Sequence, residues 1–222
     1  MMISRLRLEN PGAVDISKLV DGGEYWIHQE MSRLFAGEGA EKRSFVYRRD
    51  DRNGRPECMV VSAAPPIGAG RVWAVEAKPY APRISTGELY TFSLRVNPVV
   101  TRRFGPDKRH ARHDVVMDAK RQRKPAGSAT VTQAELCQTA GLEWIRRKGQ
   151  HHGFTVVEDL LRIGGYRQLV IYKRNRQPIR FSTLEFDGAL QVTNSDELLS
   201  ALFAGVGPAK GFGCGLLLVK RI

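Results

Sequence analysis

The stretch Gly205-Val206-Gly207-Pro208-Ala209-Lys210-Gly211-Phe212-Gly213-Cys214-Gly215 holds five glycines in eleven residues. It follows a segment with the signals of a helix, which is capped by Asn194 or Ser195 and runs to about Ala204. It precedes residues 216–219, an apolar run that is typical of a buried strand. The stretch is therefore a helix-to-strand connection, the reverse of the strand-to-helix order of dinucleotide-binding folds.

The residues upstream of this connection predict the rest of the same domain. Residues 90–96 alternate between apolar and polar side chains, which indicates a half-buried strand. Thr132 begins a capping-box pattern for a helix that ends near Lys148. Gly164-Gly165 predicts the turn of a hairpin, and strands are expected at residues 154–163, 166–173, 179–186 and 189–192. Once the extra strands are set aside, the order is β-α-β-β-α-β, the split pattern of a ferredoxin-like domain.

The first 85 residues predict the same order of elements in an incomplete form. A helix is expected at residues 15–35, and strands are expected at 3–8, 44–49, 57–63 and 71–77. Gly22-Gly23 predicts a break or kink in the helix, because each glycine costs about 1 kcal/mol in a helix interior. A second helix is missing or very short. The predicted fold class is α+β, with two tandem ferredoxin-like (RRM-like) domains built on antiparallel sheets, at residues 1–85 and 86–222.

The chain is strongly basic. Its 222 residues contain 35 Lys and Arg against 23 Asp and Glu, which gives a formal charge of +12. Such an excess attracts polyanions, usually nucleic acid, although a bias toward solubility gives the same composition. Cys58, Cys137 and Cys214 are far apart and form no C-x-x-C pair, which fits a reducing cytoplasm. No apolar run approaches the roughly 18 residues of a membrane span, so we expect a cytoplasmic protein without membrane contact.

The positive charge gathers in two segments. Between Leu160 and Phe181 no residue is acidic and six are basic, namely Arg162, Arg167, Lys173, Arg174, Arg176 and Arg180. A basic two-stranded ribbon suits the backbone and grooves of a nucleic-acid duplex, whereas a charged strand edge that only prevents aggregation is the alternative. Residues 102–124 predict a basic loop with a short strand near Val115-Val116, and its first candidates for RNA backbone contacts are Arg102 and Arg103.

The glycine-rich stretch itself has two interpretations. It does not match the P-loop pattern, and Lys210 stands where the third glycine of the dinucleotide-binding pattern belongs. Backbone N–H groups around Gly207, together with the charge of Lys210, would suit a phosphate. A tight connection that needs positive φ angles explains the same glycines without a ligand.

Histidines are the candidates for proton transfer. His110 and His113 form an H-x-x-H pair in a positively charged loop, which is a poor metal site, so no metal is expected. His28 lies on the polar side of the first helix, with Tyr25 one turn earlier on the same face. RNA cleavage needs a base for the 2′-hydroxyl and an acid for the departing 5′-oxygen, and an imidazole transfers protons at neutral pH. Spacing alone leaves His28 open between this role and that of an ordinary surface histidine.

Four blocks of the sequence resemble one family. They are Tyr25-Trp26-Ile27-His28-Gln29 with Leu34-Phe35, then Leu94-Arg95-Val96-Asn97-Pro98, then Phe186-Asp187-Gly188-Ala189-Leu190, and then Gly205-Val206-Gly207-Pro208-Ala209-Lys210 with Phe212-Gly213-Cys214-Gly215-Leu216. The blocks stand in the family's order, span nearly the whole chain, and are most specific at the end. The chain thereby resembles the CRISPR-associated endoribonucleases of the CasE type, the crRNA-processing subunit of the type I-E Cascade complex.

The resemblance implies two ferredoxin-like domains and a defined reaction. Such a protein binds the hairpin of each CRISPR repeat in pre-crRNA and cuts at the 3′ base of the stem without metal or other cofactor. The 2′-hydroxyl attacks, which leaves a 2′,3′-cyclic phosphate and a 5′-hydroxyl. The resemblance implies His28 as general acid, Tyr25 as the residue that orients or deprotonates the 2′-hydroxyl, and a basic helper at Arg33. The basic hairpin would hold the stem, and the protein, a monomer outside the complex, would stay on its crRNA with other Cascade subunits.

Two other functions stay open at this point. A non-catalytic subunit that binds an RNA hairpin would use the same basic surfaces and leave the RNA intact. A DNA-binding regulator would prefer duplex DNA, but the sequence has no helix-turn-helix pattern. The departures from the family pattern lie beside the predicted site, since Gly22-Gly23 precede Tyr25 and the bulky Trp26 follows it. Both features affect how the helix presents His28.

Overall fold

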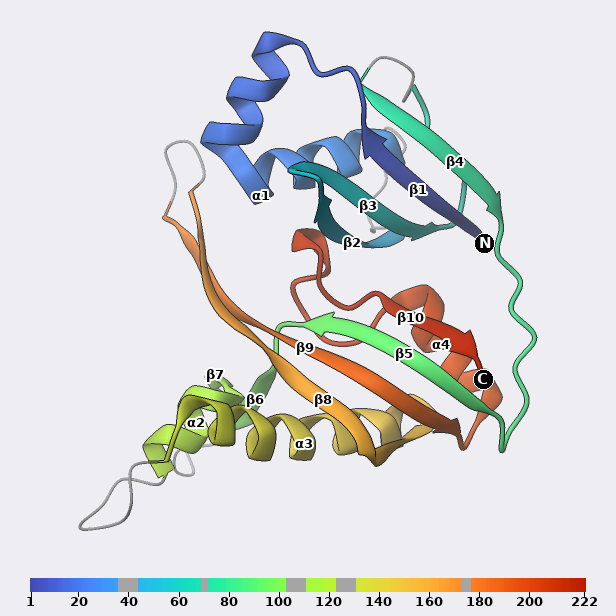
Figure 1. Cartoon of the computed structure of the whole chain (residues 1–222), viewed down its shortest axis with the longest axis vertical. Helices are drawn as coiled ribbons and strands as arrows, with labels where there is room; N and C mark the ends of the chain where they lie inside the picture. The colour runs from blue at the N-terminus through green and yellow to red at the C-terminus, as the bar shows by residue number, and fades with distance from the viewer. Residues whose placement is uncertain (36–43, 69–71, 103–110, 123–130, 173–176) are drawn as a thin grey trace.

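The computed structural model describes residues 1–35, 44–68, 72–102, 111–122, 131–172 and 177–222. These residues form two four-stranded antiparallel sheets, one above the other in Figure 1. The first sheet, in the order β2-β3-β1-β4, contains β1 (Met2–Leu8), β2 (Phe45–Arg52), β3 (Arg55–Ser62) and β4 (Trp73–Pro79). The second, in the order β10-β5-β9-β8, contains β5 (Leu89–Val96), β8 (Phe154–Ile171), β9 (Ile179–Val192) and β10 (Leu217–Arg221). Counted along the chain, both sheets have the same strand order.

One bent helix covers the first sheet. α1 (Ala13–Phe35) changes direction at Gly23, whose φ of 44° and ψ of −117° are not helical, so the predicted kink is confirmed. Beyond the bend, Ile27, Met31 and Leu34 are fully buried in a cluster with side chains of β1, β2 and β3. Between β3 and β4, the described residues 63–68 and 72 form no second helix.

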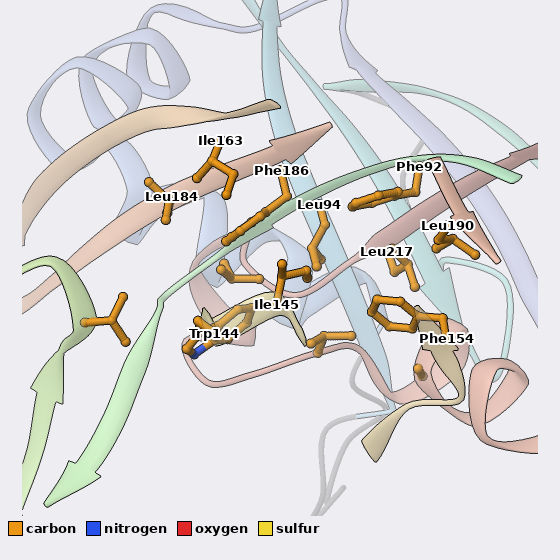
Figure 2. Packing of buried hydrophobic residues seen from close by; sticks show 14 of the residues in the cluster. Phe92, Leu94, Trp144, Ile145, Phe154, Ile163, Leu184, Phe186, Leu190 and Leu217 are labelled. Atoms are coloured by element: carbon orange, nitrogen blue, oxygen red, sulfur yellow. The ribbon is translucent and has the colours of Figure 1, made fainter. Parts of the chain in front are cut away.

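Two helices complete the second half of the chain, α3 (Gln133–His151) and α4 (Ser195–Ala204). The predicted capping box of Thr132 and the predicted N-cap at Asn194 are both confirmed by side-chain hydrogen bonds. Trp144 of α3 stacks on Phe186 of β9 with ring centroids 5.7 Å apart, and Figure 2 shows this pair among the buried residues. The order β5-α3-β8-β9-α4-β10 is the predicted β-α-β-β-α-β unit, and the α+β fold class is confirmed.

The Gly164-Gly165 pair does not form a turn, so this prediction is wrong. β8 runs through it as one strand of 18 residues, which pairs with β9 on both sides of the glycines. Gly165 has a φ of 60° and lies at a shift in the register, so the pair forms a β-bulge. The chain reverses between Ile171 and Ile179 instead, and the predicted basic hairpin is one long β8–β9 ribbon.

The two predicted strands at 179–186 and 189–192 are likewise one strand, β9. A β-carbon at Gly188 would lie 2.7 Å from the carbonyl oxygen of Leu160 on β8. This close approach falls where β8 has its other register shift, between Val157 and Arg162. The glycine therefore makes room for a bulge in the partner strand and does not end β9.

The segment after β5 also differs from its prediction. A small ladder of β6 (Val99–Arg102) and β7 (Ala111–Asp114) leads into helix α2 (Val115–Gln122), so Val115-Val116 begin a helix and not a strand. Asp114 caps α2, because its carboxylate accepts a hydrogen bond of 2.7 Å from the backbone N–H of Met117. Both valines are buried in the hydrophobic core of the second half of the chain, and this packing outweighs the strand preference of branched side chains.

The two halves meet at the face of the first sheet that lies opposite α1. Val46 and Val61 of this face are buried against Leu216, which precedes β10. Beside this contact, Tyr80 and Phe203 meet edge to face, with ring centroids 5.9 Å apart. An apolar seam therefore joins the first sheet to the α4–β10 region.

A cluster of charged side chains completes the joint. Arg95 of β5 donates hydrogen bonds to Asp50 of β2 (Nη2 to Oδ1, 3.0 Å) and to Glu185 of β9 (Nε to Oε1, 2.9 Å). It also donates to the backbone carbonyl oxygen of Arg49. Arg48 of β2 lies 3.8 Å from the same Glu185 carboxylate. We call Arg48, Asp50, Arg95 and Glu185 the joint network, because the Arg95–Asp50 and Arg48–Glu185 ion pairs link strands of the two sheets.

Candidate active site

Tyr25 and His28 lie one turn apart on α1, just beyond the bend at Gly23. Their ring centroids are 6.0 Å apart, and both side chains are half-buried. Trp26 is buried and stacks on Trp73 of β4 at 6.1 Å, on the opposite side of the helix from His28. The bulky Trp26 therefore fixes the rotation of the helix and does not crowd the predicted site.

The glycine-rich connection reaches His28 from the other half of the chain. Its short helix η1 (Lys210–Phe212) brings the Phe212 ring to 5.0 Å from the His28 ring. Tyr47 of β2 anchors this turn by donating a hydrogen bond of 2.9 Å to the carbonyl oxygen of Gly211. His28 is thus contacted from both halves of the chain, a feature that no local pattern around it predicts.

Backbone geometry accounts for several glycines of the connection. Gly205 and Gly215 have φ angles of 74° and 92°, and β-carbons there would lie 2.9 Å from Val46 and 2.8 Å from the carbonyl oxygen of Val206. Gly207 packs next to the Trp144 ring, which a β-carbon would approach to 3.5 Å. The tight-connection interpretation therefore holds for these positions, and phosphate binding at Gly207 stays a prediction.

The β8–β9 ribbon arrives at the same place. Phe181 of β9 lies 5.8 Å from Phe212, and the next-but-one residue of β9, Thr183, pairs with Arg167 of β8. Arg167 and Arg162 are both exposed on β8. Figure 1 shows the ribbon rising from the second sheet toward α1. Two of the predicted RNA-binding arginines therefore lie on the element that leads to His28.

Other predicted site residues lie elsewhere. Arg33 forms an ion pair of 2.9 Å with Glu30, which also accepts a hydrogen bond from Nε1 of Trp73, so Arg33 lies on the side of α1 that faces β4. Arg102 of β6 is paired with Asp118 of α2, in the region drawn beside β7 in Figure 1. The structure places neither arginine with Tyr25 and His28. Arg103, Lys173, Arg174 and Arg176 lie outside the described residues.

Lys210 stands at the start of η1, where it influences the end of α3. Burial lowers the pKa of His152, and the positive charges of Lys148 and Lys210 lower it further. His152 is the C-cap of α3, so the charge of Lys210 acts on the C-terminal end of that helix. Its predicted part in RNA binding stays a prediction.

Arg49 and Glu24 adjoin the site and were missed in the sequence. Arg49 of β2 donates to Glu24 of α1 (Nη1 to Oε1, 3.1 Å), and Glu24 directly precedes Tyr25. Burial raises the pKa of Glu24, while the charges of Arg49 and Arg95 oppose that rise. The signal in the sequence was Arg48-Arg49-Asp50-Asp51, because four successive charges in a strand need partners if both faces are covered.

The described residues offer neither a thiolate at Cys58 or Cys214 nor a cluster of metal ligands. Burial raises the pKa of Cys214 to about 12 and that of Cys58 further still, so both thiols are protonated at neutral pH. Across the described ranges, no group of three His, Cys, Asp or Glu side chains is placed to hold a metal ion.

No helix in those ranges is both long enough and apolar enough to span a bilayer.

The whole chain was compared with known families. A model of the family described as CRISPR associated protein matches residues 1–221. The chain belongs to the CRISPR associated protein family. The resemblance seen in the four sequence blocks is therefore confirmed at the level of the family.

Relatives of this CRISPR-associated protein are similar over most or all of their length. The Cascade subunit CasE of Escherichia coli strain K12 is 25% identical over 196 residues, which are 87% of this chain and 89% of CasE. The CRISPR endoribonuclease Cse3 bound to 19 nt RNA has a TM-score of 0.72 at 22% identity, with 100% of both chains covered. Thermus thermophilus Cse3, bound to an RNA that represents a pre-cleavage complex, has a TM-score of 0.70 at 23% identity, with 99% of both chains covered. The tandem ferredoxin-like fold is therefore shared with Cse3.

Proposed function

We propose that this CRISPR-associated protein is a metal-independent endoribonuclease that binds the CRISPR repeat hairpin and cuts pre-crRNA at the 3′ base of the stem. The position of His28 carries the proposal, since it lies beside Tyr25 and against Phe212, where a ribbon with exposed arginines ends. The similarity to Cse3, which was solved with RNA, supports the same activity.

Cleavage by the 2′-hydroxyl moves two protons. The 2′-oxygen loses its proton and attacks phosphorus, the bond from phosphorus to the 5′-oxygen breaks, and that oxygen gains a proton. We assign the second transfer to the His28 imidazole and the placement or deprotonation of the 2′-hydroxyl to Tyr25. Arg33 remains the proposed cationic helper, and its guanidinium has to leave Glu30 to reach a phosphate.

The β8–β9 ribbon is the proposed holder of the stem. Arg162 and Arg167 supply guanidinium groups for the phosphates, and the other proposed contacts are Arg102, Arg103, Lys173, Arg174, Arg176, Gly207 and Lys210. After cleavage the protein stays on the crRNA within Cascade, the complex that the name of its relative CasE gives for that protein. We further propose a cytoplasmic monomer outside the complex, with the catalytic helix in a domain of residues 1–85 and the ribbon in a domain of 86–222.

Cleavage chemistry is tested with the cognate repeat hairpin in excess EDTA. We expect full activity, a 2′,3′-cyclic phosphate on the upstream product, and no cleavage when the nucleotide before the scissile phosphate is 2′-deoxy. The reason is that the attacking atom belongs to the RNA and the proton carriers to the protein. A need for added metal, or cleavage of the 2′-deoxy RNA, would contradict the proposal. Tight binding that leaves the all-ribose RNA intact would support the non-catalytic alternative.

Stem binding is tested by the salt dependence of affinity. For Arg162→Ala combined with Arg167→Ala, we expect weaker binding of the 2′-deoxy hairpin and a slope of log K against log salt that is smaller by about 1.5, because two phosphate contacts are lost. Filter binding over a range of salt concentrations gives the slope. Arg146→Ala is the control, since this exposed arginine lies on α3 and is ion-paired with Glu158. An unchanged slope in the double variant would remove the ribbon from the proposed interface.

A further inference from the structure

Four arginines surround a hollow at the open end of the first sheet. Arg5 and Arg7 come from β1, while Arg52 and Arg55 flank the turn between β2 and β3. The hollow encloses about 530 Å³. Leu6 and Leu8 of β1 are buried in the cluster that contains α1, so the alternating Arg5 and Arg7 lie on the opposite face of the sheet. The site is therefore separate from the helix that carries His28.

The charges that line the hollow are positive in sum. Four arginines face two carboxylates, Glu9 and Glu57, which leaves a charge of +2. Glu57 holds two of the arginines, with Arg5 at 2.8 Å and Arg52 at 3.4 Å. Arg55 is exposed and makes no ion pair with any residue in the described ranges. Arg7 is paired with Glu76 of β4 at 2.8 Å, which lowers the surplus to +1, so the carboxylates order the guanidinium groups without fully neutralising them.

Position along β2 connects the hollow to the proposed active site. Arg49 binds Glu24, the neighbour of Tyr25, and Arg52 follows it by three residues, which is about 10 Å along an extended strand and places Arg52 on the opposite face of the sheet. The ribbon that ends at Phe212 approaches Tyr25 and His28 from the second half of the chain. The hollow therefore lies around the edge strand β2 from Tyr25, on the face of the sheet that carries Arg48 and Asp50 of the joint network.

The geometry points to this hollow as the binding site for the single-stranded RNA that continues past the scissile bond on its 3′ side. The inference rests on the proposed function, since a stem held by the ribbon presents its 3′ base at His28 and sends the following nucleotides toward the first sheet. Guanidinium forks bind phosphate oxygens in two-point geometry. No aromatic side chain lines the hollow among the described residues, so the contacts address the RNA backbone and tolerate any base sequence.

The binding energy of this strand acts at a distance from the reacting atoms. A strand fixed on both sides of the scissile phosphate has less freedom to move out of line with the 2′-oxygen. The hollow is therefore a positioning site for the leaving strand. After cleavage, that strand is no longer covalently linked to the stem.

The test measures affinity for three uncleavable RNAs that carry 2′-deoxyribose before the scissile phosphate. One is the cognate hairpin alone, one has eight added nucleotides on the 3′ side, and one has eight on the 5′ side. The variant is Arg52→Ala combined with Arg55→Ala, which leaves the more buried Arg5–Glu57 pair intact. Arg221→Ala is the matched control, because its side chain is 67% exposed and ion-paired, as that of Arg52 is 70% exposed and ion-paired.

We expect the 3′ extension to tighten binding to the unaltered protein about ten-fold, and the double variant to lose this gain. The Arg221→Ala variant keeps it, and all three proteins bind the bare hairpin equally. The inference is overturned if the 3′ extension gives no gain in affinity, or if the gain survives in the double variant. It is also overturned if Arg221→Ala loses the gain equally, or if the 5′ extension produces it. Failure to cut the all-ribose hairpin would count against the endoribonuclease, whereas the comparison of extended and bare hairpins decides the inference separately.

Discussion

His28→Ala lowers the single-turnover rate of hairpin cleavage by about 10²–10⁴-fold and leaves the affinity for the hairpin nearly unchanged. The magnitude is that of a lost general acid, because the departing 5′-oxygen then takes its proton from water. Affinity is kept since the side chain contacts Tyr25 and Phe212, while the proposed phosphate contacts lie on the ribbon. Rapid mixing with enzyme in excess measures the chemical step without product release.

The matched control is His151→Ala, an exposed histidine on α3. We expect its cleavage rate to equal that of the unaltered protein. Added imidazole restores part of the lost rate in His28→Ala, which a purely structural defect would not allow. A drop of less than ten-fold in His28→Ala, or an equal drop in both variants, would contradict the assignment of His28 as general acid.

Arg95→Met lowers the free energy of unfolding by about 2–3 kcal/mol. Its guanidinium is the shared partner of Asp50 and Glu185, and its side chain is only 23% exposed. Removing it leaves two carboxylates of reduced solvation with Arg48 as their shared cation in the joint network, and that loss exceeds what the added apolar contact returns. Urea unfolding followed by tryptophan fluorescence measures the change, because Trp26 and Trp73 report on the first half and Trp144 on the second.

Arg221→Met serves as the comparison for this effect. Its ion pair with Glu88 is exposed, so we expect a loss below about 1 kcal/mol. Arg95→Lys keeps the charge but lacks the fork, and an intermediate loss is expected. If Arg95→Met unfolds with the same free energy as Arg221→Met, the joint network does not stabilise the contact between the halves.

Much of the fold could be predicted because its signals are local. The alternation at residues 90–96, the capping box at Thr132 and the break at Gly22-Gly23 each depend on neighbours within a few positions. Gly164-Gly165 was misread, because a glycine pair suits a turn or a bulge, and the choice depends on β9, which pairs with both flanks of the glycines. The division of the chain at residue 85 stays a prediction.

The candidate site was predictable only in part. Tyr25 and His28 followed from helical spacing and from the family resemblance, but their contacts with Phe212 and the nearby Arg49 depend on how two distant segments pack. Arg33 has the expected charge, yet Glu30 is available one turn away and binds it. Charge and spacing therefore pointed to one helix, and tertiary packing decided which of its side chains meet the second half.

The contact between His28 and Phe212 also sets a timetable for biosynthesis. The two residues are 184 positions apart, so at about 5–20 residues per second of chain growth roughly 10–40 s pass between their incorporation. Once residue 79 has been added the first sheet has all its strands, while the second still lacks β10 and the turn that meets the histidine. A nascent chain on the ribosome therefore cannot complete the proposed active site until the turn that holds Phe212 has been added.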